Sequence, residues 1–235
     1  MNIIDRFIQK ILYSLRITSK PFGGRSGLST PKKDSKPSKG ILKPSVAILV
    51  GHSRSGDNGA MTLDSSTSEW DYNSDIAKRT QKILEDSPIK TSVFNKYKGN
   101  SYTQAILQLS KDLNKLEYDL VIELHFNSFY NPQASGYENI YWHSSKKGKK
   151  AAEEIQRSFK SFFPKSHKER TIKAISHSSQ RGGMLLKHTE APSVICEPFF
   201  GSNKSEWKFF KSTKGRNKLS KAYAKAITSI LIPTP

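Results

Sequence analysis

The chain has 235 residues, 35% of them hydrophobic, and its 39 lysines and arginines against 20 acidic residues give a formal net charge of +19. This length suits one α/β domain with an extension, and no apolar run reaches the roughly 18 residues that a transmembrane helix needs. The single cysteine, Cys196, excludes an intramolecular disulfide framework and a cysteine-rich zinc module.

The positive charge is concentrated at the two ends of the sequence. Residues 1–44 have a net charge of +8 and residues 146–235 of +14, whereas residues 45–145 have −3. A field of this strength favours an anionic polymer as partner: nucleic acid, a phospholipid surface or phosphate-bearing envelope glycans. The alternative is a solvated surface that only keeps the protein in solution, although +19 exceeds the magnitude of roughly 2–8 that solubility needs.

The first 44 residues are predicted to form a basic N-terminal extension. Residues 2–16 have the apolar spacing of an amphipathic helix, which could lie on an anionic membrane or pack on a domain. Charged residues interrupt the apolar stretch and no small-residue cleavage site follows it, so we expect no signal peptide and synthesis in the cytoplasm. Residues 19–44 are rich in proline, glycine, serine and lysine, which predicts a disordered linker.

From Ser45 onward, short apolar runs alternate with helical periodicity. Buried strands are predicted at Val46–Val50, Leu120–Leu124 and Val194–Cys196, and weaker ones at Thr91–Phe94, Glu138–Trp142 and Met184–Leu186. Helices are predicted at Asn73–Glu85, Tyr102–Leu116, Gly148–Phe163 and Asn217–Leu231. This alternation indicates a single α/β domain over residues 45–235 with a mainly parallel sheet.

Three of the predicted strands end at residues that can carry chemistry. The first strand leads into His52, the second into His125 and the third into Glu197. In an open parallel sheet the carboxyl ends of the strands share one edge, so these side chains are expected to meet. One histidine at a strand end is more often a hydrogen-bonded structural residue, but two histidines with a carboxylate favour a site.

Two histidines and a carboxylate are the protein ligands of a catalytic zinc ion whose fourth position is open to water. Spacing alone leaves the ligand carboxylate open among Asp57, Asp64, Glu69, Asp71 and Glu197. Glu69 could also be an ordinary acid preceding the helix that starts near Asn73, which is expected to be its cap. Alternation along the third strand predicts that Cys196 faces away from Glu197, into the core.

Five motifs then carry a resemblance to a known family. The first motif consists of Gly51-His52, then Asp57–Ala60, then Glu69 with Asn73 four residues later. It resembles the opening of the zinc-dependent N-acetylmuramoyl-L-alanine amidases of the amidase-3 type. Four further segments resemble the later motifs of this family, in the same order, and the match covers residues 46–231. These segments are Glu123–Ser128, Gly136–Glu138, Arg181-Gly182 and Pro192–Asn203. Glu123 stands where the family commonly has serine, Pro198 follows the last glutamate, and residues 143–180 match no motif.

The resemblance implies a mixed, mainly parallel twisted sheet flanked by helices. It also implies a Zn²⁺ ion, and hydrolysis of the amide between N-acetylmuramate and L-alanine in peptidoglycan. The implied zinc ligands are His52, Glu69 and His125, with Glu197 as the catalytic carboxylate. Substrate binding is expected of Asn127, Glu138, Arg181 and His188, while His143, His167 and His177 are expected to be surface or supporting residues, with His177 the next most able to touch substrate.

The favoured interpretation is a peptidoglycan amidase. The short chain, the missing signal and the basic extension favour a phage-type lysin that acts at the bacterial cell wall, with peptidoglycan as partner. Anionic envelope polymers or a membrane surface could be further partners through the basic tail, and no specific nucleic acid is expected. One alternative is a non-catalytic protein that binds anionic envelope polymer or nucleic acid on a degenerate amidase fold. The other is a different zinc amide hydrolase, such as a peptidase.

Overall fold

The computed structural model describes residues 43–233, which contain a six-stranded sheet. The helix predicted for residues 2–16 and nearly all of the linker lie outside the described residues. In spatial order, the strands are β2 (Lys90–Phe94), β1 (Ser45–Val50), β3 (Leu120–Leu124), β6 (Ser193–Glu197), β4 (Glu138–Trp142) and β5 (Lys173–Ile175). Neighbouring strands are parallel except for β4, which is antiparallel to β6. The predicted mixed, mainly parallel sheet is therefore confirmed.

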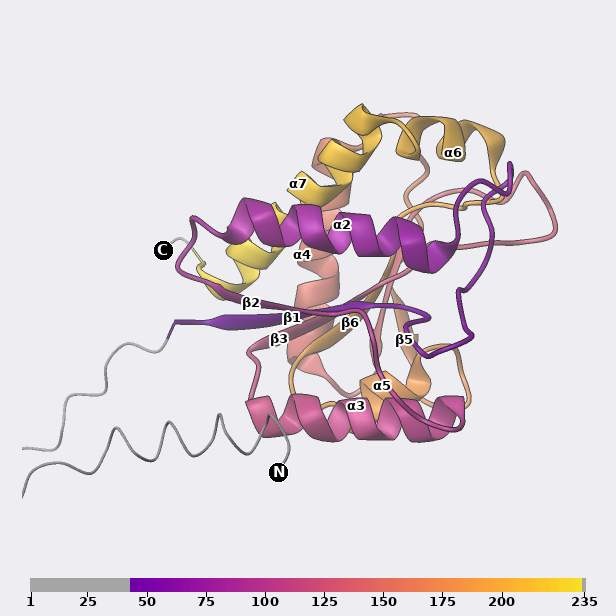
Figure 1. Ribbon diagram of the computed structural model, residues 1–235. Coiled ribbons are helices and arrows are strands. Elements are labelled where there is room, and N and C mark those ends of the chain that lie inside the picture. The colour runs from indigo at the N-terminus through magenta and orange to yellow at the C-terminus, as the bar shows by residue number, and fades with distance from the viewer. Residues whose placement is uncertain (1–42, 234–235) are drawn as a thin grey trace, which may run out of the picture. The chain divides into compact units, whose positions relative to one another are not determined.

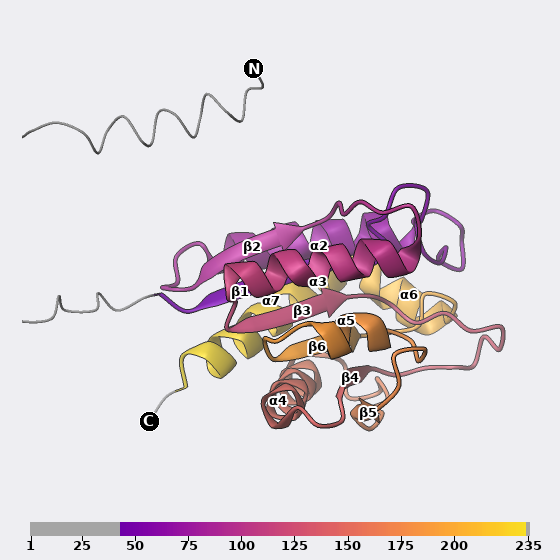
Figure 2. The same ribbon diagram turned by 90° about the horizontal axis from the view of Figure 1, so that it is seen from below.

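Helices cover both faces of the sheet (Figure 1). One face carries α2 (Glu69–Leu84), α4 (Lys146–Phe162) and α7 (Thr213–Leu231), and the short α6 (Lys204–Phe210) precedes α7. The other face carries α3 (Tyr102–Leu116) and α5 (Gly183–His188), which Figure 2 shows in front of the sheet. No helix among residues 43–233 is both long and apolar enough to span a membrane.

The strands read as continuous apolar runs because both faces of the sheet are buried. Along β1, Val46, Ile48 and Val50 pack into the core beneath α2, α4 and α7, while Ala47 and Leu49 pack against α3. The same alternation on β6 places Cys196 in the larger core, as predicted, and turns Glu197 to the opposite face.

Two local predictions were wrong. Met184–Leu186, predicted as a weak strand, lies within α5, where the Leu186 amide donates to the carbonyl of Gly182 at 3.1 Å. A run of three apolar residues is too short to distinguish the two periodicities. Asn73 is not a helix cap: α2 begins at Glu69, and the capping Ser68 side chain accepts a hydrogen bond from the Asp71 amide at 3.1 Å.

Candidate active site

The carboxyl ends of β1, β3 and β6 lie next to one another because these three strands are parallel neighbours. His52 and His125 follow the first two strands, and Glu197 ends the third. A cleft of about 700 Å³ opens at this edge, and all three side chains line it. Glu69 reaches the same cleft as the first residue of α2.

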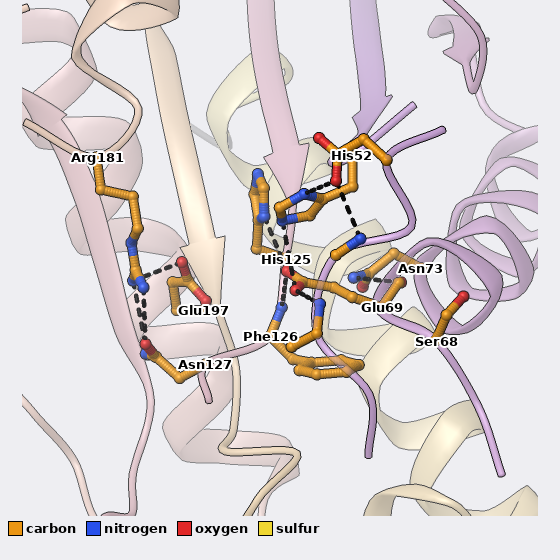
Figure 3. Close-up of polar contacts among 12 residues, drawn as sticks. His52, Ser68, Glu69, Asn73, His125, Phe126, Asn127, Arg181 and Glu197 are labelled. Carbon is orange, nitrogen blue, oxygen red and sulfur yellow. Dashed lines mark hydrogen bonds and ion pairs between the residues drawn. The ribbon is translucent and has the colours of Figure 1, made fainter. Parts of the chain in front are cut away.

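The two histidines and Glu69 form a tight cluster (Figure 3). Glu69 Oε2 lies 3.4 Å from His52 Nε2, and Glu69 Oε1 lies 2.9 Å from His125 Nδ1. One ligand atom from each residue falls within 4.8 Å of the others. Of the five carboxylates that spacing left open, Glu69 is the one that lies against both histidines.

Glycines make room for both rings. A Cβ on Gly51 would lie 2.2 Å from Cε1 of His125, and a Cβ on Gly59 would lie 2.6 Å from Cδ2 of His52. Gly59 also has φ +69°, a left-handed conformation that glycine adopts without strain. The Glu69 carboxylate is fixed in turn, because it accepts hydrogen bonds from the backbone amides of Ala60 (3.2 Å) and Phe126 (3.1 Å).

Each histidine has a second carboxylate behind its ring. Asp57 Oδ1 lies 2.9 Å from His52 Nδ1, and Glu123 Oε2 lies 3.3 Å from His125 Nε2. Burial lowers the pKa of both rings, but the hydrogen bonds and charges of the carboxylates outweigh it, so the pKa of His52 is raised and that of His125 well raised. Although burial raises the pKa of Glu69, its hydrogen bonds to the two histidines lower it overall.

These contacts fit a bound divalent metal ion. Each of the four ring nitrogens faces a carboxylate oxygen, but a neutral histidine has only one N–H to donate. The charges and hydrogen bonds are therefore satisfied only when both rings carry an extra proton or a cation lies between the rings and Glu69. A dication supplies the same charge as the two extra protons. Donors about 2.1 Å from a tetrahedral metal ion lie roughly 3.4 Å apart, close to the spacings from Glu69 to the two rings.

Glu197 lies between this cluster and Arg181 (Figure 3). Its Oε1 is 2.6 Å from Nη2 of Arg181, and its Oε2 is buried without a hydrogen-bond partner among the described residues. Burial raises the pKa of Glu197 to about 7, even though the charge of Arg181 lowers it. A carboxyl group with this pKa can accept and return a proton near neutral pH.

Three residues predicted to bind substrate meet beside Glu197. Arg181 donates from Nη1 to Asn127 Oδ1 at 3.0 Å and lies 3.7 Å from Glu138 Oε1. Glu138 stands opposite Glu197 in the pairing of β4 with β6, and its other oxygen accepts from Arg170 Nε at 3.0 Å. The three residues thus form one polar network beside Glu197, and of the three only Arg181 lines the cleft.

The structure places His188 away from this network. It lies in the last turn of α5, its carbonyl accepts from Asn114 Nδ2 at 3.0 Å, and it is not among the residues that line the cleft. His167 does not line the cleft: its side chain is 5% exposed, and its Nδ1 lies 3.1 Å from Glu206 Oε1.

Two site residues were missed as supports of the histidines. The sequence presents Asp57 only as one of five candidate ligands, and Glu123 only as a departure from the family pattern. The signal for Glu123 is its position two residues before His125, which places it on the same face of β3. Asp64 and Asp71 instead accept hydrogen bonds from nearby serines, Ser66 and Ser68.

Comparisons with known proteins agree with this geometry. Residues 46–229 match the amidase-3 family, described as N-acetylmuramoyl-L-alanine amidase. The curated proteins contain no match to the chain in sequence.

Several solved structures share the fold. The catalytic domain of the amidase CwlV from Bacillus (Paenibacillus) polymyxa var. colistinus is 20% identical, with 80% of this chain and 98% of that one covered and a TM-score of 0.68. An N-acetylmuramoyl-L-alanine amidase from Clostridium difficile 630 is 21% identical over 83% and 100%, with a TM-score of 0.70. The catalytic domain of an endolysin targeting Clostridia difficile is 23% identical over 80% and 97%, with a TM-score of 0.62.

Proposed function

The chain belongs to the amidase-3 family of N-acetylmuramoyl-L-alanine amidases, and we propose that it works with a zinc ion held by His52, Glu69 and His125. Its reaction is hydrolysis of the amide bond between N-acetylmuramate and L-alanine in peptidoglycan. The observation that supports the metal most directly is the pair of histidines whose ring nitrogens all face carboxylates. Nitrogen and carboxylate donors with one open position are the ligands of catalytic zinc.

Zinc in this site would polarise the carbonyl group of the scissile amide and lower the pKa of a water molecule toward neutrality. Glu197 is the general base: it takes a proton from the attacking water and returns it to the nitrogen of L-alanine as the C–N bond breaks. Its unpartnered Oε2 supports this role, since a buried acceptor costs about 1–3 kcal/mol when nothing donates to it. A water molecule or the leaving amine supplies the missing donor.

Arg181 holds the other oxygen of Glu197 and so fixes the direction of the free one. More than half of the Arg181 side chain is exposed to the cleft, which leaves it donors for a substrate carbonyl or carboxylate. We assign Arg181 to substrate binding on this basis. Asn127 and Glu138 do not line the cleft, and we assign them to holding the Arg181 guanidinium in place. His188 receives no such assignment, because it does not line the cleft.

The test uses purified cell walls with and without a chelator, and measures free L-alanine amino groups and stem peptides released. We expect release that a chelator abolishes and zinc restores. Glu197→Gln should keep zinc and fold but lose about 10²-fold or more in turnover. His125→Ala should lose the metal, and full zinc occupancy in that variant would refute the ligand assignment. Cleavage of peptides that lack muramate would indicate a peptidase instead.

We further propose that the protein is an endolysin-type enzyme, made in the cytoplasm and acting at the bacterial cell wall. The positive charge supports this, because +14 lies on residues 146–235 and +8 on residues 1–44. Cell walls and envelope membranes carry phosphate groups that such a charge attracts over long range. We therefore propose anionic envelope polymer as a second partner beside peptidoglycan. The attraction is one of charge, and no sequence-specific binding of nucleic acid is expected.

A further inference from the structure

Large apolar side chains are exposed at the edge of the cleft. Eight are exposed within residues 43–233, and four of these lie on two loops that hydrogen-bond to the same segment after β6. We call these four residues the apolar platform: Met61, Leu63, Phe129 and Tyr130. Tyr130 is 90% exposed, and its ring lies 4.2 Å from that of Phe129, centroid to centroid. Exposed apolar surface collected in one place indicates a binding site more often than scattered single residues do.

Two loops carry the platform, and both are tied to the loop after β6. Leu63 donates its backbone amide to the Gly201 carbonyl at 2.9 Å, and Phe129 donates its amide to Ser202 Oγ at 3.0 Å. Both loops leave the sheet at the end where β1 and β3 stop (Figures 1 and 2). The loop that carries the two aromatic rings is thus anchored by a hydrogen bond to the loop after β6.

The two loops that carry the platform also contribute residues to the wall of the active-site cleft. Ala60 and Ser128 line the cleft, and they are the immediate chain neighbours of Met61 and Phe129. A molecule that reaches from the cleft over these two loops would therefore meet the exposed rings.

We propose that the apolar platform binds the glycan strand of peptidoglycan beside the bond that is cut, an inference that rests on the proposed function. The scissile bond joins a sugar to a peptide, so both parts of the substrate extend from the cleft. A sugar ring presents uncharged C–H groups on its faces, which pack on aromatic rings while its hydroxyl groups stay in water. The peptide, with its ionised carboxylates, suits the charged side near Arg181 and Arg170 instead.

The test measures binding of chitohexaose, a peptide-free oligomer of N-acetylglucosamine, by titration calorimetry on the full chain. Phe129→Ala with Tyr130→Ala should weaken binding about tenfold or more, as for the removal of central aromatic contacts elsewhere. Tyr130→Phe keeps the ring and should bind as the wild type does. The control is Ile83→Ala with Leu116→Ala, two exposed apolar side chains on α2 and α3, away from the platform loops.

Kinetics give a second readout. The double aromatic variant should raise KM for intact cell walls and leave turnover of a single-sugar muramoyl-peptide within about twofold. Wild-type affinity of that variant for chitohexaose, no oligosaccharide binding by the wild type, or loss of affinity for free stem peptide instead would each overturn the proposal. Chitohexaose contains no muramoyl-alanine amide, so its binding does not depend on the proposed reaction. If chitohexaose binds through Phe129 and Tyr130 but the enzyme releases no peptide from walls, only the proposed function is refuted.

Discussion

His52 and His125 each depend on a carboxylate behind the ring. A histidine that donates one N–H to a carboxylate is held in one tautomer, which leaves the opposite nitrogen free to ligate a metal. Asp57 is placed to accept from Nδ1 of His52, and Glu123 is placed to accept from Nε2 of His125. The atoms that face Glu69, and would face the proposed metal ion, therefore differ between the two rings: Nε2 of His52 and Nδ1 of His125.

Glu123→Gln is expected to weaken zinc binding by about 10–100-fold, the usual effect of removing such a support. An amide can still accept from His125 Nε2, but without charge it holds the tautomer less firmly. Competition with a chelator of known affinity measures the change, and nitrogen NMR of the metal-free protein reports the tautomer. Glu117→Gln, at the exposed end of α3, is the matched control. Unchanged zinc affinity with an unchanged tautomer would contradict the role given to Glu123.

The pH dependence of catalysis is predicted from Glu197. It must be ionised to accept a proton, so with a pKa of about 7 its activity should fall about tenfold per pH unit below that value. Arg181 lowers the pKa of Glu197, so Arg181→Met should move the acid limb of kcat/KM to higher pH. Both enzymes carry the same metal site, and the difference between their pH profiles isolates the guanidinium. A limb that stays in place or moves to lower pH would assign proton transfer to another group.

At the scale of elements, the sequence predicts what is long, periodic or fully buried. β1, β3 and β6 are runs of buried apolar residues, and α3 was predicted with its observed ends. β5 was missed because it has three residues and only Ile175 is buried. α6 was missed because seven residues give too little periodicity, although Asn203 caps it by accepting from the Ser205 and Glu206 amides.

The candidate site was predictable to a similar degree. His52, His125 and Glu197 follow buried strands, so parallel topology alone brings them together. Predicting Glu69 as part of the site required the family motif. The loop before α2 brings this residue back to the cleft, and the hydrophobic pattern of the sequence does not indicate the path of that loop. The platform and the supports of the histidines depend on contacts between distant segments, which spacing along the chain does not show.

The buried carboxylate of α6 is predicted to stabilise the fold. Glu206 accepts from the amides of Gly136 (2.6 Å) and Phe200 (2.7 Å) and pairs with His167, whose Nε2 donates to the carbonyl of Pro198 at 2.8 Å. In Glu206→Gln, the side-chain NH₂ group would face one of the backbone amides that now donate to the carboxylate. The variant should therefore lower the free energy of unfolding by about 2–4 kcal/mol. Urea denaturation measures the loss. Glu153→Gln on the surface of α4 should cost less than about 0.5 kcal/mol, and equal effects would contradict the prediction.

For the molecule as a whole, the positive charge is arranged in ways that folding does not explain. Lysines recur along α7 at intervals of four, three and four residues, which places them on one face of a helix without acidic residues: Lys214, Lys218, Lys221 and Lys225. Four more occupy the first two turns of α4: Lys146, Lys147, Lys149 and Lys150. Cations near a helix N-terminus oppose the helix dipole, so the α4 group does not serve helix stability.

The α4 group is instead expected to hold the enzyme on phosphate-bearing cell walls. Exposed charges are screened over about 8 Å at physiological ionic strength, so wall binding should weaken steeply between ~50 mM and ~500 mM salt. Replacing these four lysines with glutamine should reproduce the high-salt behaviour at low salt. Turnover of a small uncharged muramoyl-peptide and the melting temperature should not fall, because the lysines take no part in bond cleavage and oppose the helix dipole.

A charge-matched control distinguishes position from net charge. It replaces four exposed lysines on other elements with glutamine: Lys82, Lys90, Lys111 and Lys115. Both variants lose four charges, so binding governed only by net charge would weaken equally in the two. We expect cosedimentation with walls at low salt to drop clearly for the α4 variant and only slightly for the control. Wall binding that ignores both salt and the α4 substitutions would leave targeting to sugar contacts beside the cleft, where Phe129 and Tyr130 stand exposed.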